Sequence, residues 1–359
     1  MKLLFLNTNI GYGGASKMIV WVANQCASAG HDVTLLTYRD CTVNQVVVSR
    51  VKHVHQQLED INGKVSIFHT IKWLKGFIIE ERFDVAVAFL SPSQLRLYFA
   101  CLGTKTKTLF SQRGDPFSTQ KGLKAQLINI VNNWTFTHAD ELVFQTNQAM
   151  AFYGNAIKHK STVIPNPINP LRRTEIRDGN ITKRIVSVGR LDIRQKRQDL
   201  LIKAFCRICG KYPDYVLEFY GDGADELNLK SMAQGIPQIR FMGKTANVTE
   251  AIQSASMFVL SSDFEGIPNA LLEAMALGLP CISTDCSPGG AALLIQDKVN
   301  GILTKRGDVD ELAKAMKFLL DNHEQAESLG KEAMAVAEIY SEERIREQWL
   351  GLLEKMLPK

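Results

Sequence analysis

The sequence predicts an α/β protein made of two domains, each a doubly wound parallel sheet with helices on both faces. Apolar strand-length runs alternate with helix-length segments through both halves of the chain, and most predicted strands end in glycine or another small residue. The length of 359 residues and the hydrophobic content of 45% suffice for two domains of roughly 150 to 200 residues each.

The first half begins with an apolar strand at residues 2–7, followed by a glycine-rich turn and a helix at residues 18–29 that ends before Gly30. Gly13 and Gly14 belong to this turn. Its spacing is not that of a dinucleotide-binding fingerprint, and no acidic partner for a ribose follows, so a nicotinamide site is disfavoured. Further strands are predicted at residues 32–38, 84–89, 106–111, 141–145 and 162–164.

A proline-rich segment, residues 165–170, breaks the regular pattern and is followed by a polar, charged run that reaches Lys183. We place the domain boundary here, with a first domain at residues 1–170 and a second at residues 171–340. A last amphipathic helix is predicted at residues 342–356. Its pattern allows it either to complete the second domain or to cross back to the first.

The second half repeats the alternation of strands and helices. Because the carboxyl ends of parallel strands open onto the ligand crevice, glycine-containing turns there let the backbone approach a bound molecule. The first loop holds four cations, of which Arg190 and Lys196 are suited to bind a diphosphate; ordinary surface cations are the alternative. The predicted strands are residues 184–188, 216–220, 239–242, 257–260, 281–284 and 301–304, with a helix at residues 198–209.

The most informative stretch is residues 261–280, which contains a loop and a short helix with Pro268 near its first turn and Gly278 past its end. Glu265 lies in the loop and Glu273 one turn into the helix. Carboxylates only accept hydrogen bonds, so at such a ligand-binding edge they suit the hydroxyl groups of a sugar. The alternative is that both are first-turn glutamates favoured by the helix dipole.

Charge is uneven along the chain. Residues 1–175 carry 19 Lys and Arg against 11 Asp and Glu, a net charge of +8, whereas the remaining residues carry 23 against 26, a net charge of −3. Five cations gather before and within an amphipathic segment, residues 123–136, which fits contact with an anionic membrane surface or a phosphorylated acceptor. A solvated helix face is the alternative, and no recognition motif supports nucleic acid. These cations are Lys105, Lys107, Arg113, Lys121 and Lys124.

Cysteines and apolar runs indicate the cellular compartment. Seven scattered cysteines favour reduced thiols, and we interpret Cys206 and Cys209 as buried thiols rather than as a zinc or redox site. No apolar run approaches the ~20 residues of a membrane-spanning helix, and the first apolar run is too short for a signal peptide. We therefore expect a cytoplasmic protein, with the inner face of the cell membrane as an additional location.

Four motifs occur together in this chain. They are Gly189-Arg190-Leu191-Asp192 with Lys196, Tyr220-Gly221-Asp222-Gly223, the Glu265 and Glu273 pair within Glu-Gly-Ile-Pro-Asn-Ala-Leu-Leu-Glu, and Gly289-Gly290 before a helix. In this combination the chain resembles the retaining glycosyltransferases of the GT4 family over nearly its whole length. The resemblance implies a GT-B fold: two Rossmann-like domains facing a cleft, the second binding a nucleotide sugar, and a final segment, residues 341–359, returning to the first domain.

The resemblance also implies roles for individual residues. Arg190 and Lys196 would neutralise the donor diphosphate and stabilise its departure, doing the work that Mg²⁺ does elsewhere, so that no metal and no cofactor are implied. Glu265 would bind hydroxyls of the donor sugar and Glu273 those of the ribose. The other implied donor contacts are Gly13 and Gly14 beneath the phosphates, and Gly266, Ile267, Pro268 and Asn269 at the helix start.

The sequence departs from the family pattern in the first domain, where many members carry a histidine near the reacting sugar. Arg113 occupies that position, and Asp115 follows two residues later. We expect either that Arg113 binds a phosphate of the donor or acceptor, or that Asp115 contacts the acceptor hydroxyl.

Together these features predict a glycosyltransferase that moves a hexose or N-acetylhexosamine from a nucleotide sugar, expected to be UDP-linked, with retention at the anomeric carbon. The expected acceptor is a lipid-linked glycan or oligosaccharide in surface polysaccharide or lipopolysaccharide assembly. Two alternatives remain: a nucleotide-sugar epimerase of the same fold, and a catalytically silent subunit that binds nucleotide sugar.

Overall fold

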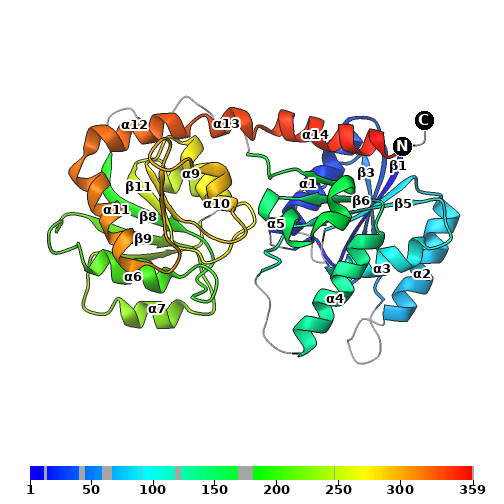
Figure 1. The fold of residues 1–359 in the computed structure, drawn as a ribbon, viewed down its shortest axis with the longest axis horizontal. Helices are drawn as coiled ribbons and strands as arrows, with labels where there is room; N and C mark the ends of the chain where they lie inside the picture. Colours follow the sequence, from blue (N-terminus) through cyan, green and yellow to red (C-terminus); the bar gives the residue numbers. More distant parts are fainter. Residues whose placement is uncertain are drawn as a thin grey trace. The chain divides into compact units, whose positions relative to one another are not determined.

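The computed structural model describes residues 1–11, 14–39, 45–58, 67–89, 91–117, 123–168, 181–245 and 247–357. It contains two compact units, each with helices packed around a parallel sheet (Figure 1). Unit 1 comprises Met1–Pro165 with Glu343–Lys359, and unit 2 comprises Asn166–Glu342. The units therefore divide after Pro165 and after Glu342, a few residues from the boundaries predicted at 170 and 340.

Unit 1 is built on a seven-stranded parallel sheet in the order β3-β2-β1-β4-β5-β6-β7. Strand β1 sends Leu3 and Phe5 into one core cluster and Leu4 and Leu6 into another, as expected of a strand that is covered on both faces. The strands are β1 (Lys2–Asn7), β2 (Asp32–Thr37), β3 (Val51–His55), β4 (Val85–Ala88), β5 (Lys107–Gln112), β6 (Glu141–Phe144) and β7 (Ser161–Val163). The helices are α1 (Gly14–Ser28), α2 (Ile67–Glu81), α3 (Ser91–Cys101), α4 (Leu123–His138), α5 (Asn147–Phe152) and the 3₁₀ helix η1 (Asn155–Lys160).

Strand β3 is the strand of unit 1 that the sequence pattern misses. It lies at the edge of the sheet and exposes Lys52 and His53, so it lacks the apolar run that marks a buried strand. The other strands of unit 1 match their predicted ranges to within one residue at each end.

The last helix, α14 (Glu342–Lys355), packs within unit 1. Its buried side chains Ile345, Trp349 and Leu353 belong to the same core cluster as Leu3 and Phe5 of β1. The amphipathic pattern left two destinations for this helix, and the structure assigns it to the first half of the chain.

Unit 2 has a six-stranded parallel sheet in the order β10-β9-β8-β11-β12-β13. Its predicted strands agree with the structure to within two residues at each end, and β9 and β12 have the predicted ends. The strands are β8 (Thr182–Val188), β9 (Val216–Tyr220), β10 (Ile239–Gly243), β11 (Ala255–Leu260), β12 (Cys281–Thr284) and β13 (Ile302–Thr304). The helices are α6 (Gln198–Cys206), α7 (Glu226–Met232), α8 (Val248–Ile252), α9 (Asn269–Ala276), α10 (Gly290–Leu294), α11 (Val309–Asp321), α12 (His323–Ala333) and α13 (Val336–Ile339).

The interpretation of Cys206 and Cys209 as buried thiols is wrong. Helix α6 ends at Cys206 rather than at residue 209, and Cys206 lies exposed on the same face as Lys203 while Cys209 is half-buried. The apolar residues of α6 that pack into the core, such as Leu201 and Phe205, lie on the opposite face. Cys206 is exposed because it lies on the polar face of the helix, whereas Cys209 lies beyond the end of α6 and packs against the core cluster that contains Leu201 and Phe205.

Candidate functional site

Several loops of unit 2 meet at one edge of its sheet. The carboxyl ends of parallel strands all lie at the same edge, which is where open α/β sheets bind ligands. The loops after β8, β9, β11 and β12 are therefore brought together, although they are far apart in the sequence. These loops are residues 189–197, 221–225, 261–268 and 285–289.

Glycines let these loops touch backbone to backbone. A Cβ on Gly221, whose φ is +136°, would lie 2.1 Å from the carbonyl oxygen of Gly189. A Cβ on Gly290 would lie 1.6 Å from the carbonyl oxygen of Gly266. Any larger residue at Gly221 or Gly290 would force two loops apart, so the glycine motifs of the sequence here serve close packing.

Lys196 and Glu265 form an ion pair between the loops after β8 and β11. The Lys196 ammonium contacts Oε1 of Glu265, and the Ser262 hydroxyl donates to the same oxygen at 2.7 Å. Only 19% of the Lys196 side chain and 9% of the Glu265 side chain are exposed. The backbone N–H of Glu265 also donates to the Ser287 carbonyl at 2.7 Å, which ties in the loop after β12. The sequence predicted both residues as site residues but not their contact.

Arg190 is held differently in the same loop. Its side chain is 63% exposed, and Nη2 donates to Oδ2 of Asp192 and to Oε1 of Gln195, both at 2.9 Å. Gln195 in turn donates through Nε2 to the Phe264 carbonyl at 3.2 Å. Arg190 therefore lies at the surface of the site with its guanidinium oriented by neighbours, whereas Lys196 lies deeper.

The site also contains polar residues that were not predicted from the sequence. Asp263 accepts a hydrogen bond from Arg197 Nη1 at 2.9 Å through Oδ2, and its carbonyl accepts one from Arg306 Nη1 at 3.3 Å. Arg306 follows β13, so its presence depends on the strand order of the sheet, which no local pattern reveals. Ser262 and Gln195 flank predicted residues and could have been found only as neighbours of the motif.

Helix α9 begins where the loop after β11 ends. Ile267 and Pro268 are buried, while Gly266, Asn269 and Glu273 are half-buried. The first turn of α9 holds no acidic residue, because Glu265 precedes the helix and Glu273 lies beyond the first turn. The helix-dipole alternative for the two glutamates therefore does not fit their positions.

The predicted site residues Arg113 and Asp115 of unit 1 lie in the loop that follows β5. The Arg113 guanidinium carbon lies 4.8 Å from the Phe89 ring centroid and 5.4 Å from that of Trp349, and Nη1 donates to the Ile164 carbonyl at 3.5 Å. Burial lowers the pKa of Arg113 to about 9, which leaves it charged at neutral pH. Asp115 accepts a hydrogen bond from the Phe117 N–H at 2.7 Å.

Other predicted positions are only partly covered by the structure. Gly14 begins α1, while Gly13 lies outside the described residues. Lys121 and the side chain of Lys124 also lie outside them. Within the parts of the chain that the structure describes, no three His, Cys, Asp or Glu residues are grouped so that they could hold a metal ion.

Both halves of the chain match glycosyltransferase family models. Residues 13–167 match the model described as a glycosyl transferase 4-like domain, and residues 182–322 match the one described as glycosyl transferases group 1. The chain is 27% identical to an uncharacterized glycosyltransferase of Haemophilus influenzae, over 98% of this chain and 99% of that protein. It is 24% identical to an alpha-1,4-N-acetyl-D-galactosaminyltransferase of Campylobacter jejuni, over 99% of each chain.

Solved structures share the fold. HepE of Anabaena, solved in complex with UDP, superimposes with a TM-score of 0.81 at 18% identity and covers 99% of this chain and 100% of that chain. The lipopolysaccharide outer core galactosyltransferase WaaB gives a TM-score of 0.79 at 19% identity, again over 99% and 100%. With glycosyltransferase models matching both of its halves and two Rossmann-like parallel-sheet units as its fold, this chain belongs to the GT4 family of GT-B glycosyltransferases and is a hexosyltransferase.

Proposed function

We propose that this enzyme transfers a hexose or N-acetylhexosamine from a UDP-sugar to a lipid-linked glycan, with retention at the anomeric carbon, in surface polysaccharide or lipopolysaccharide assembly. The observation that carries the proposal is the Lys196–Glu265 pair beside Arg190 at the carboxyl edge of the unit 2 sheet. A cation and a carboxylate side by side suit a ligand with a diphosphate next to sugar hydroxyls, because ammonium and guanidinium groups bind phosphate oxygens and a carboxylate accepts from hydroxyls.

The proposed roles of the individual residues are those that the family resemblance implies. Lys196 and Arg190 bind the diphosphate and stabilise the negative charge that develops on it as the bond to the sugar breaks, without a metal ion or cofactor. Glu265 accepts hydrogen bonds from the donor sugar, and Glu273 accepts them from the ribose. Gly266, Ile267, Pro268 and Asn269 line the start of α9 beside them. Contacts of Gly13 and Gly14 with the phosphates stay a prediction from the family resemblance.

The names of related proteins support the choice of donor and acceptor. The Campylobacter jejuni relative is named for an N-acetylgalactosamine transfer onto a glycan on PP-undecaprenol, and HepE was solved with UDP. A lipopolysaccharide 1,6-galactosyltransferase of Escherichia coli is 33% identical over 165 residues, which cover 43% of this chain and 42% of that protein. Hexoses and N-acetylhexosamines carried by UDP, with lipid-bound acceptors, are therefore the first substrates to test.

A panel of UDP-sugars tests the proposed function. We expect one UDP-sugar to raise the melting temperature and to be hydrolysed slowly to UDP, since a ligand at 100 times its Kd stabilises a protein by about 2.7 kcal/mol. Release of UDP should accelerate when a lipid-linked glycan is added. Conversion of the sugar to its epimer without acceptor would identify an epimerase instead, and binding without any turnover would identify a catalytically silent subunit.

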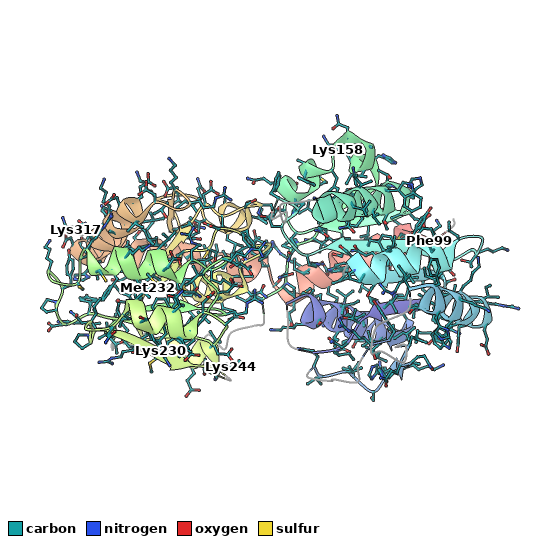
Figure 2. All side chains as sticks on the ribbon, turned by 90° about the horizontal axis from the view of Figure 1, so that it is seen from below. Phe99, Lys158, Lys230, Met232, Lys244 and Lys317 are labelled. Carbon is teal, nitrogen blue, oxygen red and sulfur yellow. The ribbon has the colours of Figure 1, made fainter. Side chains whose placement is uncertain are left out.

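A surface of unit 1 supports a membrane-bound acceptor. On α4, Leu127, Ile130 and Trp134 are 62%, 65% and 40% exposed, and their spacing places them on one outward face of the helix. Phe99 of α3, labelled in Figure 2, is 36% exposed and stacks on Trp134 with ring centroids 5.7 Å apart. A purely solvated helix face would carry polar residues here, whereas apolar and aromatic groups suit the headgroup region of a bilayer. We call Phe99, Leu127, Ile130 and Trp134 the outward apolar face.

We expect the protein to bind anionic vesicles reversibly, and to bind them less as salt rises from about 0.05 to 0.5 M, because the Debye length then falls from roughly 14 to 4 Å. None of the helices in the described residues is long and apolar enough to cross a membrane. Ile130→Ser should weaken sedimentation with vesicles. Phe68→Ser is the matched control, because Phe68 is 83% exposed on α2, outside the outward apolar face. Sedimentation without lipid preference or salt effect would favour a water-soluble acceptor.

A further inference from the structure

The first residue of unit 2 is hydrogen-bonded to the helix that begins at the proposed donor site. Asn166 follows Pro165, where the chain leaves unit 1, and is only 4% exposed. Its Nδ2 donates to Oδ1 of Asn269 at 2.8 Å, across 103 residues of sequence. Asn269 is the first residue of α9 and lies four residues after Glu265. Because the Asn166 side chain is buried, its amide needs a hydrogen-bond partner, and the bond to the half-buried Asn269 fixes the relative orientation of the two side chains.

The two segments that connect unit 2 to unit 1 are also joined to each other. The backbone N–H of Ile168 donates to the Tyr340 carbonyl at 2.8 Å, and Ile168 forms a parallel bridge with Ser341. The Tyr340 hydroxyl donates to the Leu293 carbonyl of α10 at 3.2 Å. The incoming segment is thus bonded to α9 and the outgoing segment to α10, the two helices that follow the loops at the site.

Packing reinforces these hydrogen bonds. Ile168 and Tyr340 share one core cluster with Ile267 and Leu271 of the α9 region and with Ala291 of α10. Helix α9 has only eight residues, and Pro268 at its N-cap supplies no side-chain hydrogen bond to its first turn. Because a helix this short is not stable by itself, the position of its first turn depends on tertiary contacts. The Asn166–Asn269 hydrogen bond is such a contact.

We propose that Asn166 is a positioning residue for donor binding: its amide holds Asn269, and with it the first turn of α9, in the orientation that the donor requires. Through the same bond, donor binding orders the segment by which the chain enters unit 2. This inference rests on the proposed donor site and adds to it a residue outside the four motifs that carry the family resemblance.

A double-mutant cycle with Asn166→Ala and Asn269→Ala tests the proposal, with UDP affinity from calorimetry and hydrolysis of the best UDP-sugar as readouts. In the otherwise unchanged protein, Asn166→Ala should lower the UDP affinity, the rate of UDP-sugar hydrolysis, or both, by about two- to tenfold, the range expected for one hydrogen bond. In the Asn269→Ala background the same change should have almost no further effect. An equal loss in both backgrounds would overturn the proposal. Asn166→Leu, which keeps the packed volume, replaces Asn166→Ala in the cycle if that variant does not fold.

Asn300→Ala provides the matched control for a purely structural role. Asn300 donates through Nδ2 to the Leu294 carbonyl at 3.1 Å and accepts through Oδ1 from the Gln296 N–H at 2.8 Å, in another loop of unit 2. The Asn300→Ala variant should have a lower melting temperature and an unchanged affinity for UDP. If Asn166→Ala behaves in the same way, Asn166 is structural only and the proposal is overturned.

Hydrogen exchange supplies a second readout that loss of stability alone does not move. Residues 166–168 carry two exchangeable backbone amides, because Pro167 has none. Saturating UDP should slow hydrogen exchange at the Ile168 backbone amide in the parent protein. It should not slow this exchange in the Asn166→Ala variant. Unchanged protection in the variant would overturn the coupling. A parent protein that binds no UDP and no UDP-sugar overturns the proposed donor site as well, whereas binding by the parent with no effect of Asn166→Ala overturns only the inference.

Discussion

Lys196→Ala is expected to lower turnover of the UDP-sugar by roughly 10²-fold or more, the scale seen when one electrostatic stabiliser of a developing anion is removed. Lys196 is well placed for this role because it is largely buried beside Glu265, where a charge is screened less than at the surface. Arg190→Ala should have a loss of the same scale. Steady-state rates of donor hydrolysis, and of transfer once an acceptor is known, measure both.

The matched control for these two variants is Arg194→Ala. Arg194 lies in the same loop and is exposed, so its removal changes the local net charge equally. Its turnover should stay close to that of the parent. Lys196→Ala leaves the Glu265 carboxylate buried without its cation, which costs stability, so melting curves must accompany the kinetics. Folded Lys196→Ala and Arg190→Ala enzymes with rates within threefold of the parent would refute the diphosphate role.

Substitution of the two glutamates is expected to affect different measurements. Glu265→Gln should spare the affinity for free UDP, because the Lys196 ammonium then faces the diphosphate without a competing carboxylate. Its turnover should fall by about 10- to 100-fold, since a lost charge-assisted hydrogen bond costs about 1.5 to 3 kcal/mol and matters most in the transition state, where the sugar gains positive charge. Glu273→Gln should instead weaken UDP binding by about tenfold or more. Calorimetry with UDP and rates with the intact donor measure these effects.

Glu250→Gln is the control for the glutamate pair. Glu250 lies in the first turn of α8 in the same unit, so it represents a glutamate that a helix dipole alone would favour. Neither UDP affinity nor turnover should change in this variant. Equal loss of UDP affinity in Glu265→Gln and Glu273→Gln would show that the roles are assigned wrongly, and no loss in either assay would remove both residues from the site.

Local sequence was enough to predict most strands of the fold. Strands such as β9 and β12 are buried runs bounded by turn residues, so their ends can be read from the residues themselves. Strand β3 could not be predicted, because an edge strand with exposed Lys52 and His53 gains its structure from pairing with β2. An amphipathic pattern shows which face of α14 is apolar and not which core covers it, so its return to the first domain was predicted by the family resemblance and not by the pattern itself.

The sequence by itself determined which residue types gather at the ends of strands in unit 2, including Arg190, Lys196 and Glu265. Only the tertiary structure decided how they combine. Lys196 meets Glu265 because β8 and β11 are neighbours in the sheet, although 69 residues separate the two side chains in the chain. It also showed that Arg113 packs against Phe89 and Trp349, and that Asn166 holds Asn269. Local patterns report the period and polarity of a segment, whereas contacts between distant segments depend on strand order and on the packing of both cores, which no short stretch of sequence contains.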